Sequence, residues 1–454
     1  MNIAIRILKF IEWSLIGIVG AVILFLSISV KPIDRTDYHE KDFYVKMQEN
    51  LSELDHLTIP SPRQDFSVGF AKENITPPFK TSMAGSGIRK IEFADIRDSI
   101  YVRSIVISNG TEMVSLVSLD MLIVPPSITS LLQTKLPSIG FSLENTFLSA
   151  THTHSSIGNW GEHLAGRIYS GPYKDSLIHF VVDKIIKCIV EANENKTAST
   201  IKSGVIPTSG MLYNRLADGA GTIDSLVRVI EVNRADGKNL LLCTFTGHPT
   251  CDKSSSLSIS RDYPGVLVDK LEDERYSFAM FMAGAVGSHA CSGPERGRPR
   301  INFVGENLAS LVLQNSDSLK QVHDSTLLMV RVPLELGEPQ MKVTKDLCVR
   351  PWLFRSAFGT YPSYLTALKI GDVVMLGTPC DFSGELMPAI DSAARRNGVK
   401  AIVTSFNGSY IGYITLDKHY DIDHYETRIM NWYGPGNGSY LSESMAKMLQ
   451  ALGR

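Results

Sequence analysis

The sequence has few cysteines, no excess of basic residues and no low-complexity tract, and each shortage excludes a class of protein. Six cysteines among 454 residues are too few for a disulfide-built scaffold, and no CxxC pair occurs that would suggest a zinc ribbon or a thioredoxin-type redox site. Lys and Arg (45) nearly balance Asp and Glu (47), so no basic surplus predicts nucleic-acid binding. A composition of 44% hydrophobic and 20% charged residues is typical of a folded globular chain.

The first thirty residues contain a long apolar run that predicts a membrane address. The eighteen residues from Trp13 to Val30 carry no charge, and as a helix they span roughly 27 Å, close to the hydrocarbon thickness of a bilayer. Arg6 and Lys9 precede the run, as in the charged region of a signal sequence. A cleavable signal and a retained anchor are both open, and the length of the run favours the anchor. Either one places the body outside the cytosol, and an anchor makes the protein membrane-bound with an extracytoplasmic domain.

The rest of the chain alternates strand and helix signals without an internal repeat. Residues 31–65 are polar and mixed, and we expect them to form a linker. Asn109-Gly110 between two β-rich runs is a strong hairpin signal, and residues 176–193 place apolar side chains at the spacing of an amphipathic helix. The prediction is an α/β protein in which residues 66–454 form a single large domain of mixed β-sheet flanked by helices, preceded by a transmembrane or signal segment at residues 1–30.

Histidines at the ends of predicted strands give the sharpest functional signal. His152 and His154 occur in the segment Thr-His-Thr-His-Ser, and in an extended chain residues two apart point to the same side. Convergent imidazoles suit a zinc ion, although two ligands do not complete a site, and a solvent-facing or core histidine pair is the alternative. His248 follows another predicted strand, where it can be a further ligand or a structural histidine.

Polar and aromatic residues follow two later strands. Asp381 lies between a predicted strand and a helix, where it can bind a metal or cap the helix. Tyr410 and Tyr413 follow the next strand, where aromatic packing is the alternative to a functional role. Three scattered tryptophans can line an apolar pocket or belong to the core, namely Trp160, Trp352 and Trp432.

Several of these segments together resemble the catalytic domain of the neutral/alkaline (non-lysosomal) ceramidases. The segments are ATHTHS at residues 150–155, MLYNRL at 211–216, the Gly-His turn at 247–248, TPCDF at 378–382 and YIGYITLDKHYDIDHYE at 410–426. They occur in the order of the family and cover most of residues 66–440. The chain departs from the family where Asp381 replaces the usual Glu, and where residues 284–289 replace a loop of the form GDxSPN.

The resemblance implies a zinc amidase that cleaves ceramide into sphingosine and a fatty acid. The Zn²⁺ ligands that it implies are His152, His248, Asp381 and Tyr413. The residues that it implies to lie against the substrate are His154, Arg215 and Tyr425. From their chemistry we expect His154 to move a proton to the leaving amine, and Arg215 and Tyr425 to hold the developing oxyanion or a substrate hydroxyl.

The function expected from the sequence is hydrolysis of the N-acyl amide bond of ceramide or a related N-acyl lipid by metal-activated water. A membrane address agrees with a lipid substrate. Two alternatives stay open, because the altered loop at Gly284–Ser288 can reshape the pocket and Asp381 can weaken the site. One is a metal hydrolase acting on another N-acyl compound or an ester, and the other is a non-catalytic, membrane-anchored binding protein of the same fold.

Overall fold

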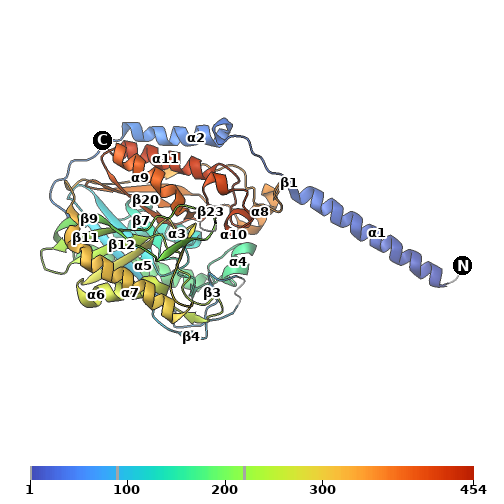
Figure 1. Cartoon of the computed structure of the whole chain (residues 1–454), viewed down its shortest axis with the longest axis horizontal. Coiled ribbons are helices and arrows are strands. Elements are labelled where there is room, and N and C mark those ends of the chain that lie inside the picture. The colour runs from blue at the N-terminus through green and yellow to red at the C-terminus, as the bar shows by residue number, and fades with distance from the viewer. Residues whose placement is uncertain (1–2, 88–90, 218–220, 454) are drawn as a thin grey trace.

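Two β-sheets pack face to face, and helices cover the outer surface of each (Figure 1). The computed structural model describes residues 3–87, 91–217 and 221–453. The larger sheet has the order β14 (Phe278–Ala283), β12 (Leu240–Phe245), β11 (Leu226–Arg234), β9 (Thr197–Pro207), β2 (Ser67–Asn74), β5 (Tyr101–Ser108), β6 (Met113–Leu119) and β7 (Thr146–Ala150), with β16 (Lys320–Gln321) beside β9. The smaller sheet has the order β17 (Leu327–Pro333), β19 (Tyr364–Ile370), β20 (Val373–Thr378) and β22 (Lys400–Ser405).

Most neighbouring strands are antiparallel, but parallel pairs occur where the chain crosses over. The parallel pairs of the two sheets are β12 with β14, β6 with β7, and β20 with β22. The predicted hairpin is present, since β5 and β6 flank the turn at Gly110, whose φ of 79° suits glycine. Short two-stranded ladders complete the fold, namely β1 (Val30–Pro32) with β18 (Leu347–Val349), β3 (Met83–Ala84) with β8 (Ser156–Ile157), β4 (Asp95–Ile96) with β13 (Ser258–Ile259), β10 (Leu212–Asn214) with β15 (His289–Cys291), and β21 (Asp381–Phe382) with β23 (Tyr413–Ile414).

The helices bury one apolar face each against the sheets. On α5 (Asp175–Glu194) the buried residues recur at spacings of three and four, from Leu177 and Val181 to Ile185 and Ile189, and this face lies on β2 and β5. The other helices of that layer are α3 (Pro126–Lys135), α6 (Asp262–Glu274) and α7 (Arg298–Asn315). The opposite layer consists of α9 (Met387–Arg396) and α11 (Asn437–Leu452), which cover the smaller sheet. The remaining helices are α1 (Ile3–Ser29), α2 (Asp42–Ser52), α4 (Leu164–Ser170), α8 (Pro351–Phe358) and α10 (Tyr425–Arg428).

The predicted membrane segment forms α1, which projects away from the body (Figure 1). Among the described helices, α1 alone is long and apolar enough to cross a membrane, since Ile5–Ser29 has a mean hydropathy of 2.2 and none of its most apolar part is buried. Residues 31–65, expected to form a linker, contain α2, which packs on α11 through the buried Met47 and Leu51. This segment therefore lies against the body.

The predicted fold class is confirmed as a mixed α/β domain with flanking helices and an apolar N-terminal segment. The division of the strands between two sheets is an addition that the sequence did not predict. The six cysteines all lie in the described part of the chain, where they are buried free thiols.

Candidate metal centre and active site

All seven residues that the sequence singled out for a role line one cavity of about 320 Å³. They are His152, His154, Arg215, His248, Asp381, Tyr413 and Tyr425. They arrive there because the chain leaves the carboxyl ends of several strands at this point, namely β7 before His152, β12 before His248, and β20 and β22 before Asp381 and Tyr413. Asp381 and Tyr413 are directly paired in the β21–β23 ladder, which makes these distant residues neighbours.

Three histidine rings point their Nε2 atoms at one another. The Nε2 atom of His248 lies 3.0 Å from that of His152 and 2.8 Å from that of His154, and the third separation is 3.2 Å. A tetrahedral zinc ion with bonds of about 2.0–2.1 Å separates its nitrogen ligands by about 3.3 Å. The spacing of the three nitrogens is therefore close to what one shared cation requires.

The other nitrogen of each ring is held by a backbone carbonyl. His152 Nδ1 donates to the Leu122 oxygen at 2.6 Å, and His154 Nδ1 donates to the Gly85 oxygen. His248 Nδ1 lies 3.1 Å from the Val286 oxygen. A proton on each Nδ1 leaves a lone pair on each Nε2, so the three Nε2 atoms have nothing to donate to one another. Three facing lone pairs in a buried cluster call for a cation between them.

The carboxylate of Asp381 supplies a fourth polar atom to this cluster. Asp381 is completely buried, and its Oδ2 accepts a hydrogen bond from the Tyr410 hydroxyl at 2.6 Å. Its Oδ1 lies 3.2 Å from His152 Nε2 and has no hydrogen-bond donor. A buried carboxylate oxygen without a donor is costly unless a cation occupies the place beside it. The histidines and Asp381 therefore fit a bound divalent metal.

Tyr413 is held on the other side of the cluster by Arg215. Arg215 Nη2 donates to the Tyr413 hydroxyl at 3.2 Å, and its Nε faces Glu426 at 2.8 Å. The same Nη2 lies 3.1 Å from His248 Nδ1. Arg215 therefore links the Tyr413 hydroxyl to the buried carboxylate of Glu426 and places its positive charge beside the His248 ring.

The electrostatics of the site keep His248 and Tyr413 neutral. Burial, and then the positive charge of Arg215, lower the pKa of His248 well below its usual range. Burial lowers the pKa of Arg215, but Tyr413 and Glu426 outweigh this and raise it, so the guanidinium stays charged. Burial and the negative charge of Asp381 raise the pKa of Tyr413 well above its usual range, so the hydroxyl stays protonated. Neutral imidazole is the form that a metal binds.

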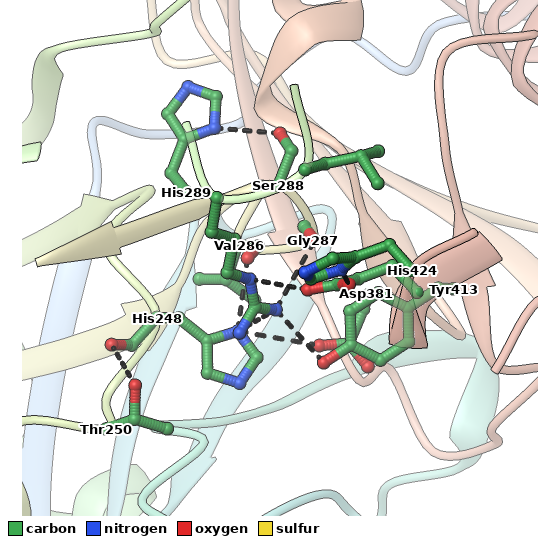
Figure 2. A network of polar contacts seen from close by, with 12 residues as sticks. His248, Thr250, Val286, Gly287, Ser288, His289, Asp381, Tyr413 and His424 are labelled. Atoms are coloured by element: carbon green, nitrogen blue, oxygen red, sulfur yellow. Dashed lines mark hydrogen bonds and ion pairs between the residues drawn. The ribbon is translucent and has the colours of Figure 1, made fainter. Parts of the chain in front are cut away.

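The segment Gly284–Ser288 supports the site from behind. Figure 2 shows Val286 and Gly287 running beside His248, while Asp381 and Tyr413 reach the site from other strands. Gly287 N–H donates to the Phe382 oxygen at 2.8 Å, and a Cβ on Gly287 would lie 2.5 Å from the Asp381 carbonyl oxygen. This segment does not line the described cavity. The segment therefore contacts His248 and the strand that carries Asp381, and it does not form the surface of the cavity.

Aromatic side chains line the cavity around the three histidines and Asp381. Trp160 and Trp432 line it, and Trp352 does not. Tyr425 lies at its edge, with 46% of the residue exposed and its ring 6.0 Å from that of Tyr413. A second cavity of about 280 Å³ shares part of this wall, including Trp160, Phe358 and Trp432. The two cavities together offer apolar surface beside the histidines.

Two supporting residues and one backbone conformation could not be predicted from the sequence. Tyr410 was noted only as one of two tyrosines at a strand end, although it holds Asp381. Phe406 stacks on the His152 ring at 4.2 Å. His152 itself has a φ of 62°, a left-handed backbone that non-glycine residues adopt mainly at functional sites. Contacts between segments that are distant in the sequence determine these three features, so no local sequence pattern predicts them.

Comparisons with known proteins identify a related sequence pattern and a similar fold. Residues 66–218 match the family model described as neutral/alkaline non-lysosomal ceramidase, N-terminal. The chain is similar to the solved structure of neutral ceramidase from Pseudomonas aeruginosa, with 17% identity and a TM-score of 0.74 over 86% of this chain and 75% of that one. It is also similar to a ceramidase complexed with C2, with 15% identity, a TM-score of 0.72 and the same coverage. No curated protein sequence matches the chain. The resemblance predicted from the motifs is thus confirmed, since residues 66–218 carry the N-terminal pattern of the neutral/alkaline ceramidases and most of the chain has the fold of the neutral ceramidases.

Proposed function

We propose that the protein is a zinc-dependent amidohydrolase that cleaves the N-acyl amide bond of ceramide or a related N-acyl lipid. The observation that carries the proposal is the meeting of three histidine Nε2 atoms and the unpartnered Asp381 oxygen at the wall of an apolar cavity. The family match of residues 66–218 supports the substrate class.

The residues that would hold the ion are His152, His248, Asp381 and Tyr413. Nitrogen and oxygen donors of this kind suit zinc. When bound, the cation would supply Lewis acidity that polarises an amide carbonyl and acidifies a water molecule. The Leu122 and Val286 carbonyls fix the ring orientation of the two histidines, and Tyr410 fixes the carboxylate.

His154 is the residue that would move a proton. Its Nε2 faces the cluster and its Nδ1 is held by Gly85, so the ring presents one basic nitrogen to a substrate in the cavity. An imidazole in this place takes a proton from the attacking water and delivers it to the leaving amine. The short distances from His154 to His152 and His248 also suit a ligand. Zinc content decides between the two roles, because a His154→Ala variant keeps its zinc only if His154 is the proton carrier.

Arg215 and Tyr425 would act on the substrate itself. The Arg215 guanidinium is buried beside Tyr413 and lines the cavity, so it carries positive charge to the place where the amide oxygen becomes negative. The partly exposed Tyr425 lies at the edge of the cavity, where its hydroxyl would bind a substrate hydroxyl. These assignments follow the roles that the resemblance implied.

The cellular arrangement that suits this function is a body of residues 66–454 held on the extracytoplasmic side of a membrane by α1. A lipid substrate partitions into the same bilayer that holds the anchor. This proximity supports an N-acyl lipid over a water-soluble amide.

Metal analysis of the full-length protein together with a substrate panel tests the proposal. We expect one zinc per chain and hydrolysis of N-acyl sphingoid lipids, with little turnover of short acyl amides or esters. The His152→Ala variant should lose both zinc and turnover, while the matched control His179→Ala, on the exposed side of α5, should lose neither. Full zinc occupancy and unchanged turnover in His152→Ala would refute the assignment. A metal-free wild-type protein without hydrolysis would favour the binding protein, and turnover of esters alone would favour the other hydrolase.

A further inference from the structure

The end of α1 is fastened to the catalytic body without a flexible connection. Val30 in β1 pairs with Val349 in β18. The Ser29 carbonyl accepts a hydrogen bond from Arg350 N–H at 2.8 Å, and Ser29 is 3% exposed. The indole of Trp352 donates to the Ile28 carbonyl at 3.1 Å. The last turn of α1 and the first turn of α8 therefore move as one unit.

This junction fixes the depth of Trp352 relative to a bilayer. The uncharged run that forms most of α1 ends at Val30, the first residue of β1, and Trp352 is hydrogen-bonded to Ile28 inside that run. When α1 crosses a membrane, Trp352 must lie where the hydrocarbon meets the headgroups. Tryptophan is enriched at this level, and basic side chains such as Lys31 and Arg350 favour the headgroup layer beside it. At the opposite end of the run, Trp13 occupies the corresponding position.

Helix α8 forms a wall of the two cavities beside the three histidines. Phe354 and Phe358 of α8 stack at 4.4 Å, and Phe358 meets the ring of Trp432 at 4.8 Å. Phe358 lines both cavities. Trp352, on the outer side of α8, is 49% exposed, and Leu164 at the start of the adjoining α4 is 62% exposed. Helix α8 thus exposes Trp352, next to Arg355 and Ser356, and has its inner face on the cavity.

The elements around the cavity gather at the end of the body from which α1 leaves. Figure 1 shows α4, α8, α10 and β1 at this end, with α1 projecting from it. Tyr169 of α4, Phe358 of α8 and Tyr425 of α10 all line the catalytic cavity. The cavity wall and the membrane anchor therefore share one side of the molecule.

We propose that Trp352 and Leu164 form a membrane seat, which rests on the leaflet that holds the C-terminal end of α1, so that the cavity receives its substrate directly from the bilayer. The occupant of this surface is the bilayer itself, because the junction at Ile28 leaves no length of chain by which the body can lift away. A lipid that enters beside α4 and α8 meets apolar side chains such as Leu164 and Phe358 on its way to the histidines. The nature of the substrate rests on the proposed function, but the seat does not.

Quenching of tryptophan emission by brominated lipid tests the seat without using activity. The full-length Trp13→Phe protein is reconstituted in vesicles of phosphatidylcholine and phosphatidylglycerol, with and without bromine on the upper acyl carbons. Trp160 and Trp432 give a constant background, and the difference between this protein and one that also carries Trp352→Phe gives the emission of Trp352. In the protein that carries both Trp13→Phe and Trp352→Phe, Leu164→Trp reports on the seat. Phe303→Trp, on the exposed part of α7, is the matched control.

We expect brominated lipid to quench emission from positions 352 and 164 and to leave position 303 unchanged. No quenching at position 352, or equal quenching at position 303, would overturn the proposal. A second arm compares Trp352→Glu with wild type on a vesicle-embedded N-acyl lipid and on a short-chain soluble one. The seat predicts a fall in kcat/KM for the embedded lipid alone, and an equal fall for both substrates contradicts it. If brominated lipid quenches the wild-type emission as expected but the protein cleaves neither substrate, the proposed function is contradicted and the membrane seat is still supported.

Discussion

Removing the hydroxyl that holds Asp381 isolates the contribution of one supporting contact to metal binding. Tyr410→Phe deletes the donor that lies 2.6 Å from Asp381 Oδ2. The aromatic ring stays, so its packing against Trp432 at 5.1 Å and Phe406 at 6.2 Å is preserved. The variant therefore changes the orientation of a proposed ligand without changing any ligand.

The expected size of the effect follows from the buried, charged character of this bond. A hydrogen bond to a charged group contributes about 1.5–3 kcal/mol, and loss of a partner behind a metal ligand weakens binding about 10–100-fold. We therefore expect the zinc dissociation constant to rise by about 10–100-fold. At a free zinc concentration about 1,000 times the wild-type constant, the ion stabilises wild type by about 4.1 kcal/mol and the variant by about 1.4–2.7 kcal/mol.

Chelator competition and urea unfolding with and without zinc measure these two quantities. Tyr433→Phe is the matched control. Tyr433 is a neighbouring, partly buried tyrosine whose hydroxyl does not bond to Asp381. The zinc affinity of this variant should equal that of wild type. If Tyr410→Phe binds zinc as tightly as wild type, Asp381 is not a ligand that depends on this hydroxyl, and the reasoning fails.

Three further variants probe the surroundings of the cluster. Gly287→Ala would bring a Cβ within 2.5 Å of the Asp381 carbonyl oxygen. Isothermal titration should therefore show weaker zinc binding, and urea unfolding should show a loss of about 1–3 kcal/mol in the free energy of unfolding. Wild-type values in both measurements would contradict this prediction. Glu426→Gln removes the negative charge that lies 2.8 Å from the partly buried guanidinium of Arg215 and should cost about 3–5 kcal/mol in urea unfolding, a prediction that a loss below about 1 kcal/mol contradicts. Burial, and then the charge of Arg215, lower the pKa of His289 to about 4, so between pH 6.5 and pH 4 the unfolded chain binds a proton at His289 that the folded chain does not. The free energy of unfolding is therefore highest above pH 6.5 and falls by about 3 kcal/mol as the pH drops to 4. His289→Gln should lose this part of the pH dependence when unfolding is followed in urea.

Sequence reasoning reached the ends of the relevant strands but not their partners. The alternation of strand and helix signals predicted a mixed α/β body, and the position of His152, His248 and Asp381 after apolar runs marked them as residues at strand ends. These inferences depend only on local periodicity, because burial of one face imposes a repeat on the chain. Periodicity cannot tell which sheet a strand joins, so the face-to-face pairing of two sheets was not predicted.

The arrangement behind the candidate ligands was also beyond the sequence. Tyr410 reaches Asp381 because β21 and β23 pair in one register, and Val286 meets His248 because two loops pack together. Neither contact has a sequence spacing that would reveal it. The packing of residues 31–65 on α11, in place of a free linker, has the same origin.

The sequence by itself determined the types of residue available for chemistry, the apolar N-terminal run and the layered α/β character, since these follow from composition and from repeats of two or about four residues. The tertiary structure alone decided that three imidazole nitrogens and a carboxylate oxygen share one point, and that α1 joins the body at the cavity wall. The physical reason is that such meetings depend on long-range strand register and side-chain packing, whose energies arise only when distant segments are already in contact.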